Sequence, residues 1–223
     1  MGSARRGWEE SRLEHGLSVI IKPVSRTREL EAQLASTEQQ LRLLQKISRY
    51  MVREVGLAKS LASVVSLVVE FMNSDSCLLY LLQDKELVLC ASNNPQPSTI
   101  GNVRLKLGEG LTGWVARERR LLSISREAYA DSRFKRFTDL PEDTYEAFLS
   151  APILVRGRVA GVINVQHRDP HPHSGGEMEL LTTVGEQIGC LLALASLDPV
   201  KLAETDLLEL VMAPAGSGSA PRR

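Results

Sequence analysis

The sequence has no excess of charge of either sign, because 27 lysines and arginines balance 27 aspartates and glutamates. A neutral chain has no overall field that attracts nucleic acid or acidic lipid, so we expect neither as a partner. Cysteine is also scarce: the 223 residues include three, all within apolar runs and without C-x-x-C spacing. Such cysteines form no disulfide framework and are typical of small buried side chains in a reducing compartment.

Long hydrophobic runs are missing as well. The longest, such as residues 191–197, fall far short of the roughly 20 residues that span a bilayer. The charged N-terminus is not followed by the apolar core of a signal peptide. We therefore expect a cytoplasmic protein that binds no membrane.

Residues 1–25 form an N-terminal extension without a clear period, in which residues 17–21 are compatible with a short strand that ends before Pro23. In residues 26–56, apolar side chains recur at a spacing close to 3.5 residues with polar residues between them, which predicts an amphipathic, coiled-coil-like helix. Its apolar stripe is narrow, so we expect it to pair with a second copy of the chain rather than to pack on its own domain. The stripe consists of Leu30, Leu34, Leu41, Leu44 and Met51.

A domain of mixed helices and strands is predicted over residues 57–198. Helical patterns cover residues 57–72, 111–119 and 176–197, and strand patterns cover 77–82, 86–91, 102–107, 121–124, 151–155 and 159–167. The last two strands are joined at Arg156-Gly157, and only antiparallel strands accept so short a turn. We therefore expect an α+β fold: a six-stranded antiparallel sheet with its helices on one face. Residues 199–223 are predicted to hold a short helix remnant and a disordered tail rich in Pro, Gly and Ser.

The segment from Gly108 to Gly113 spells G-x-G-x-x-G, the fingerprint of dinucleotide-binding folds. That fingerprint needs a full crossover helix between parallel strands, and the helix here is followed at once by the strand at 121–124. The better interpretation is that the glycines shape a corner between strand and helix and let Trp114 pack closely.

Aromatic residues are few, and five of the ten lie between residues 129 and 148. Aromatics together with Arg133 and Asp131 in a loop over a sheet are typical of a small-molecule site. Arg133 suits an anionic ligand, and pairing with Asp131 is an equally good role for it. The alternative for the whole group is a small satellite core under the loop. The candidate ligand-binding residues are Trp114, Tyr129, Asp131, Arg133, Phe134, Tyr145 and Phe148.

Three histidines, His167, His171 and His173, lie in or beside a proline-rich loop. Imidazoles at this spacing can bind zinc, but only Asp169 lies near in sequence as a further ligand, so a solvated loop without metal is the favoured interpretation. No histidine adjoins a cysteine, and we expect no catalytic residue and no cofactor.

An ordered series of motifs resembles the GAF domain family of sensor modules. The motifs are S76-C-L-L-Y-L81, L107-G-E-G-L-T-G-W114, D131-S-R-F134, F148-L-S-A-P-I153 and G161-V-I-N-V165, and the resemblance covers about residues 58–197. It is greatest to GAF domains of nitrogen-related phosphoenolpyruvate phosphotransferases and bacterial sensor kinases. The resemblance implies a six-stranded antiparallel sheet, a ligand pocket between sheet and loops, and dimerisation through flanking helices.

Several specialised activities of that family lack their residues here. The N-K-x-n-F-x₃-D-E pattern of the members that bind cyclic nucleotides is missing, and so are a bilin-anchoring cysteine in 125–148 and the cysteine set of free methionine sulfoxide reductases. After Leu197 too few residues follow to form an output domain, so we expect the output to lie in a separate protein or in a longer one that contains this segment. We expect a non-enzymatic sensor that binds a small molecule and acts as a homodimer on an unidentified signalling partner. The alternatives are a ligand-free interaction module and an enzyme that acts on a small metabolite.

Overall fold

The computed structural model describes residues 6–52, 56–93, 99–135 and 145–195. The chain divides into two units, Met1–Arg49 and Tyr50–Arg223. The helix remnant and the disordered tail expected in residues 199–223 lie outside the described residues.

The first unit is formed by one long helix, α1, which spans Arg6–Val52. A helix is thus confirmed in the region predicted at residues 26–56, but α1 begins 20 residues earlier, at Arg6 instead of residue 26. The strand expected at 17–21 is wrong, because these residues are helical. A short apolar run does not distinguish strand from helix, because its period cannot be measured over so few residues. Pro23 has no backbone N–H donor, which favours the end of a regular element at this position; here the helix continues through it.

The second unit is built around a sheet of six strands in the order β3-β2-β1-β6-β5-β4, and every neighbouring pair is antiparallel. The two central strands, β1 and β6, are the first and the last along the chain. This confirms the predicted sheet. The strands are β1 (Ser76–Gln83), β2 (Glu86–Ser92), β3 (Arg104–Lys106), β4 (Leu122–Ile124), β5 (Ala147–Val155) and β6 (Arg158–His167).

Two tight turns set the register of the sheet. Asp84 and Lys85 join β1 to β2, and Arg156 and Gly157 join β5 to β6, all with positive φ angles between 49° and 81°. A two-residue turn with both φ angles positive has the twist that connects antiparallel strands. The hairpin predicted at Arg156-Gly157 is confirmed.

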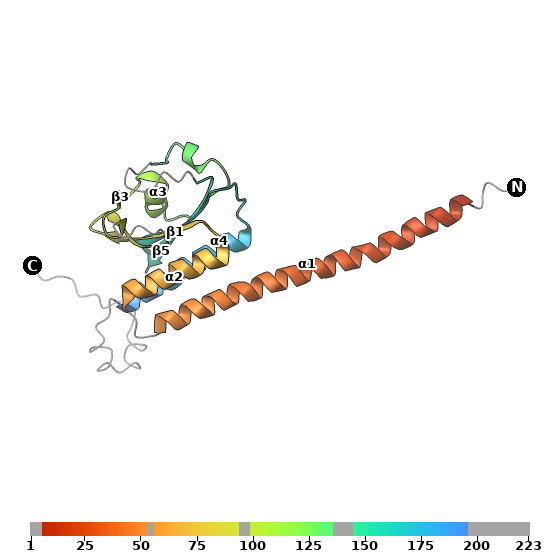
Figure 1. Ribbon diagram of the computed structural model, residues 1–223, viewed down its shortest axis with the longest axis horizontal. Helices are drawn as coiled ribbons and strands as arrows, with labels where there is room; N and C mark the ends of the chain where they lie inside the picture. Colours follow the sequence, from red (N-terminus) through yellow and green to blue (C-terminus); the bar gives the residue numbers. More distant parts are fainter. Residues whose placement is uncertain (1–5, 53–55, 94–98, 136–144, 196–223) are drawn as a thin grey trace, which may run out of the picture. The chain divides into compact units, whose positions relative to one another are not determined.

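Helices cover both faces of the sheet, which corrects the expectation that they share one (Figure 1). Helix α2 (Leu57–Met72) packs on β1 and β2, and α4 (Gly175–Ala195) packs on β5 and β6. Helix α3 (Gly110–Glu118) lies on the opposite face, where Val115 and Ala116 belong to the same buried cluster as Tyr80. The sequence of β1 already lacks the alternation of a half-exposed strand, and continuous burial is the sign of a strand covered on both sides.

Among the described residues, α4 alone is long and apolar enough by composition to cross a membrane, with a mean hydropathy of 1.3 over its best window. The helix packs on the sheet instead. Gly185 and Gly189 face the carbonyl oxygens of Pro152 and Leu154 on β5, so closely that a Cβ at Gly185 would lie 3.0 Å from the first and one at Gly189 would collide with the second. These glycines set the distance between α4 and the sheet.

Candidate functional site

The glycines before α3 form the corner that the sequence predicts. Gly108 and Gly110 have φ angles of +85° and +66°, which side chains other than glycine rarely adopt. A Cβ at Gly113 would lie 2.5 Å from the carbonyl oxygen of Lys106, so the third glycine lets α3 approach the end of β3. The helix leads into β4, which is antiparallel to β5, and the parallel crossover of a dinucleotide site is not formed by these strands.

The segment after β4 is tied to this corner by an ion pair. Lys135 Nζ lies 2.6 Å from Glu109 Oε1, while Glu109 Oε2 accepts a hydrogen bond of 2.8 Å from the backbone N–H of Lys106. The hydrogen bond from Lys135 is the main reason that the pKa of Glu109 is held below its usual value. Glu109 thus joins the glycine corner to a residue 26 positions further along the chain.

Three of the predicted ligand-binding residues form a single stack. Asp131 accepts hydrogen bonds from Nε of Arg133 at 2.8 Å and from Nη2 at 2.7 Å. The guanidinium carbon of Arg133 lies 4.6 Å from the centroid of the Trp114 ring on α3, within range for a cation–π contact. The ion pair lowers the pKa of Asp131 and raises that of Arg133. Of the two roles predicted for Arg133, pairing with Asp131 is confirmed.

Two other predicted residues lie in an apolar cluster beside this stack. Phe148 on β5 is buried together with Leu111 and Ala128, and Phe134 packs against them. The cluster joins the start of α3, the short helix η2 (Ala128–Ala130) and the edge of the sheet. The arrangement has the features of the satellite core that the sequence leaves open as an alternative.

The two predicted tyrosines belong neither to the stack nor to the apolar cluster. Tyr129 on η2 is partly exposed, and the carboxylate of Glu146 raises its pKa above the usual value. Tyr145 is half-buried at the start of the stretch that leads into β5. The seven predicted residues therefore fall into a stack on α3, an apolar cluster and two tyrosines near Glu146.

A buried chain of polar residues on the α3 face was not predicted from the sequence. Asn164 on β6 donates a hydrogen bond of 2.8 Å to Thr112 Oγ1 on α3, and its Oδ1 accepts one of 2.6 Å from Ser150 on β5. All three residues are at least nine-tenths buried. A detectable signal did exist: an asparagine within the apolar run of β6 needs a polar partner if both faces of that strand are covered.

The three histidines at the end of β6 come together. Residues 168–170 and Pro172 are exposed, as expected of a solvated loop, but two of the three histidines are not. His167 and His173 have exposed fractions of 6% and 9%. The rings of His167 and His171 stack with centroids 4.0 Å apart, and the ring of His173 lies 5.0 Å from that of His171. Burial is the main cause that lowers the pKa of His167, and it lowers that of His173 to about 4. Both are therefore neutral imidazoles at pH 7.

Two of the three cysteines do not offer an activated thiol. Cys77 is buried in β1 and Cys90 is half-buried in β2, and burial raises the pKa of both. A nucleophilic cysteine needs a lowered pKa, which favours the thiolate. The environment of these two residues thus argues against thiol catalysis.

Comparisons with known proteins agree on the fold. The chain is similar to the GAF domain of an Acinetobacter phosphoenolpyruvate-protein phosphotransferase (29% identity, 72% of this chain and 97% of that one, TM-score 0.65). It is similar to that of a Coxiella burnetii phosphoenolpyruvate-protein phosphotransferase as well (27% identity, 74% and 98% covered, TM-score 0.67). Free methionine-R-sulfoxide reductase of Neisseria meningitidis, solved with its substrate, shares the fold at 17% identity (69% and 88% covered, TM-score 0.59).

The family model of the GAF domain matches residues 56–192, which is more than half of the chain and includes α2, all six strands and most of α4. The resemblance found in the sequence motifs is thereby confirmed, and so is the expected α+β architecture. The chain belongs to the GAF domain family.

Proposed function

We propose that this chain is a regulatory GAF module that binds a small molecule on the α3 face of its sheet. The buried chain Thr112–Asn164–Ser150 carries this proposal, because it places hydroxyl and amide groups in a face that is otherwise apolar. Ligand sites combine apolar walls with a few fixed polar groups of this kind. The apolar walls would come from the cluster around Phe148 and Phe134.

The rim of the proposed site is the stack of Trp114, Arg133 and Asp131. The side chain of Arg133 remains 32% exposed, and a guanidinium has more N–H donors than the two that Asp131 engages. These free donors suit a ligand with a carboxylate, phosphate or carbonyl group. Because Asp131 already balances the charge, a neutral or singly charged ligand fits better than a multiply charged one.

The output of the module would pass through α1. Leu30, Leu34 and Leu41 are 55% to 61% exposed on this helix. We propose that they pair with the same residues of a second copy, and that ligand binding biases the paired helices between two arrangements. In this proposal the protein acts in the cytoplasm on a separate signalling partner, without nucleic acid or membrane.

A ligand-free interaction module is the second candidate, and the apolar packing of Phe134 and Phe148 favours it. In that case, side chains of the domain itself fill the region where a ligand would lie. An enzyme is disfavoured by the raised pKa values of Cys77 and Cys90.

Native mass spectrometry of the purified protein, repeated after denaturation, tests the proposal. We expect a dimer with a small-molecule adduct that denaturation removes and whose mass identifies it. Thr112→Val and Ser150→Ala remove hydroxyls with little change of shape, and each should lower the adduct occupancy. Ser132→Ala, at an exposed position of the same segment as Arg133, is the matched control. No adduct, either as purified or after incubation with a small-molecule extract of the host, would favour the interaction module.

A further inference from the structure

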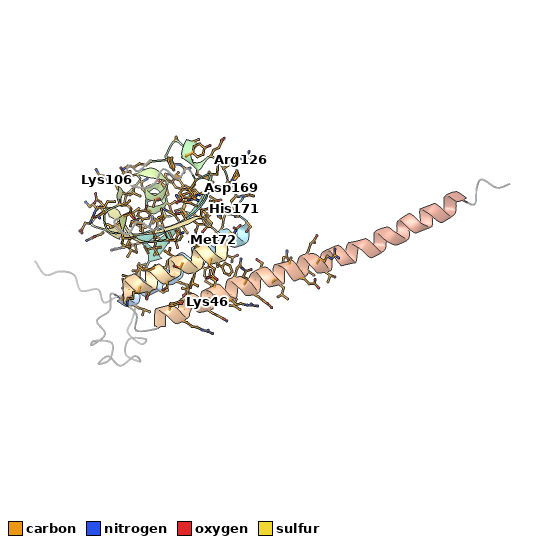
Figure 2. The ribbon with its side chains drawn as sticks, viewed as in Figure 1. Lys46, Met72, Lys106, Arg126, Asp169 and His171 are labelled. Carbon is orange, nitrogen blue, oxygen red and sulfur yellow. The ribbon has the colours of Figure 1, made fainter. Side chains whose placement is uncertain are left out.

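The three histidines lie where three elements meet. His167 is the last residue of β6, and His171 and His173 belong to the connection between β6 and α4, in which Figure 2 labels His171 and Asp169. The backbone N–H of His171 donates a hydrogen bond of 2.9 Å to the carbonyl oxygen of Ser125, just after β4. One ring nitrogen from each histidine lies within 4.8 Å of one from each of the others.

In two of the three histidines, one ring nitrogen is hydrogen-bonded to a neighbouring side chain and, within the described part of the chain, the other is not. His171 Nε2 lies 2.7 Å from Glu177 Oε1, and His173 Nδ1 lies 3.0 Å from Ser123 Oγ on β4. Histidines that bind metals use their second ring nitrogen in this way, bonded to a carboxylate or another polar group that fixes the ring. The remaining nitrogens, Nδ1 of His171 and Nε2 of His173, are the ones left for a ligand.

Glu177 is itself fixed by the start of α4. Its Oε2 accepts hydrogen bonds of 2.7 Å from both the backbone N–H and the hydroxyl of Ser174, and its own N–H donates to Ser174 Oγ at 3.2 Å. This reciprocal pair is a capping box at the N-terminus of a helix. The carboxylate that orients His171 is therefore part of the rigid frame of α4.

Two nitrogens in the cluster lack partners. Among the residues that the structure describes, His167 Nε2 and His173 Nε2 are buried without a hydrogen bond to any group. A buried polar atom without a partner is unfavourable, because it has lost its hydrogen bonds to water and gained none in the protein. Two such atoms in one cluster of imidazoles point to a ligand that accepts electron pairs from both.

We propose that His167, His171 and His173 bind one divalent transition-metal ion, with Zn²⁺ as the ion to test. Imidazole nitrogens favour zinc, copper and nickel, whereas magnesium and calcium need oxygen ligands. Three nitrogens at the usual zinc distance of about 2.0–2.1 Å lie about 3.3 Å apart in a tetrahedron. The histidine nitrogens, which lie within 4.8 Å of one another, therefore have to move closer, and the stacked rings of His167 and His171 have to tilt toward a common point. The ion joins the end of β6 and the start of α4, and its fourth position is open to water or an exogenous ligand.

The site goes beyond the proposed small-molecule function and does not depend on it. Its histidines are not among the residues of the α3 face, so either proposal can fail alone. A bound ion would act on the β6–α4 connection, which leads directly into a helix that packs on the sheet. The site is thus a second input that the domain could sense, or a clamp that stabilises the connection.

The full chain, freed of any affinity tag and washed with chelator, is titrated with Zn²⁺ by calorimetry and with Co²⁺ by visible absorption. We expect one ion per chain and the intense d–d bands of cobalt with four or five ligands. His171→Ala is the main variant because this ring is only half-buried, and it should weaken Zn²⁺ binding at least tenfold. His15→Ala, at the remaining histidine of the sequence, should leave the affinity unchanged.

A second readout covers the case in which a variant does not fold. In long-range ¹H–¹⁵N spectra of the wild-type chain, Zn²⁺ should shift the ring nitrogens of His167, His171 and His173 and leave those of His15 in place. The proposal is overturned if folded wild-type protein binds no Zn²⁺ at micromolar concentration. It is overturned equally if His171→Ala binds with wild-type affinity, or if the shifted ring signals belong to other residues.

Discussion

Asp131 accepts two hydrogen bonds, of 2.8 and 2.7 Å, from the guanidinium of Arg133, and this pair holds the cation over the ring of Trp114. The backbone N–H of Arg133 also donates to Asp131 Oδ1 at 2.9 Å, which closes a tight turn around the carboxylate. One acidic side chain thus organises both the backbone and the cation at the proposed rim. The position of Trp114 relative to solvent depends on this arrangement.

Replacing Arg133 should therefore be visible in the fluorescence of Trp114. In a Trp8→Phe background, where Trp114 is the sole tryptophan, Arg133→Ala should shift the emission to longer wavelength because the ring loses its cover. The free energy of unfolding should fall by no more than about 1 kcal/mol, since the pair is partly exposed. Arg126→Ala, at an exposed position nearby, should change neither quantity. An unchanged emission maximum in Arg133→Ala would show that the stack does not cover the ring in solution.

The same pair predicts a pH dependence. The hydrogen bond from Arg133 holds the pKa of Asp131 below its ordinary value in the folded state. A depressed acid pKa stabilises the folded chain above the ordinary value, about 3.9, and this contribution is lost as the pH falls through the lower folded value. A ¹³C titration of the Asp131 carboxyl should have its midpoint below that of a free aspartate, and Arg133→Gln should raise it. Equal midpoints in the two proteins would contradict the ion pair.

The close approach of α4 to β5 makes a prediction about stability. Alanine is the better helix former by about 1 kcal/mol, so Gly189→Ala would stabilise an isolated helix. Here the added Cβ meets the carbonyl oxygen of Leu154, and we expect a net loss of about 1–3 kcal/mol in the free energy of unfolding. Gly175→Ala, where nothing lies within 4 Å of the new Cβ, is the matched control and should be neutral. Chemical denaturation of both variants measures the difference; a Gly189→Ala protein as stable as its parent would contradict the packing.

Local patterns in the sequence were sufficient to predict those elements whose structure depends on residues close together in the chain. The turn at Arg156-Gly157 and the helix that begins at Leu57 depend on a few adjacent residues, and both were predicted correctly. The glycine corner at Gly108 was also predictable, since its unusual backbone angles need glycine wherever they occur.

The features that could not be predicted depend on contacts between residues that are distant in sequence. Ser123 and His173 are 50 positions apart, and Thr112 and Asn164 are 52 apart, so no local pattern announces that they meet. The burial of the histidines follows from these contacts, because a proline-rich loop is exposed unless other elements cover it. The face of the sheet on which α3 lies is likewise decided by packing, because the sequence of a nine-residue helix does not indicate which face it covers.

The pairing of α1 helices is the prediction that most directly tests the signalling proposal. Leu34 is exposed, and in a paired helix it would be buried against its counterpart. Leu34→Glu places an unpaired charge in that interface, so a wild-type dimer at micromolar concentration should become a monomer in light scattering. Gln39→Glu adds the same charge about 140° around the helix, at an exposed position, and should remain dimeric. A wild-type monomer at that concentration, or a Leu34→Glu dimer as stable as its parent, would show that the apolar stripe does not join two copies.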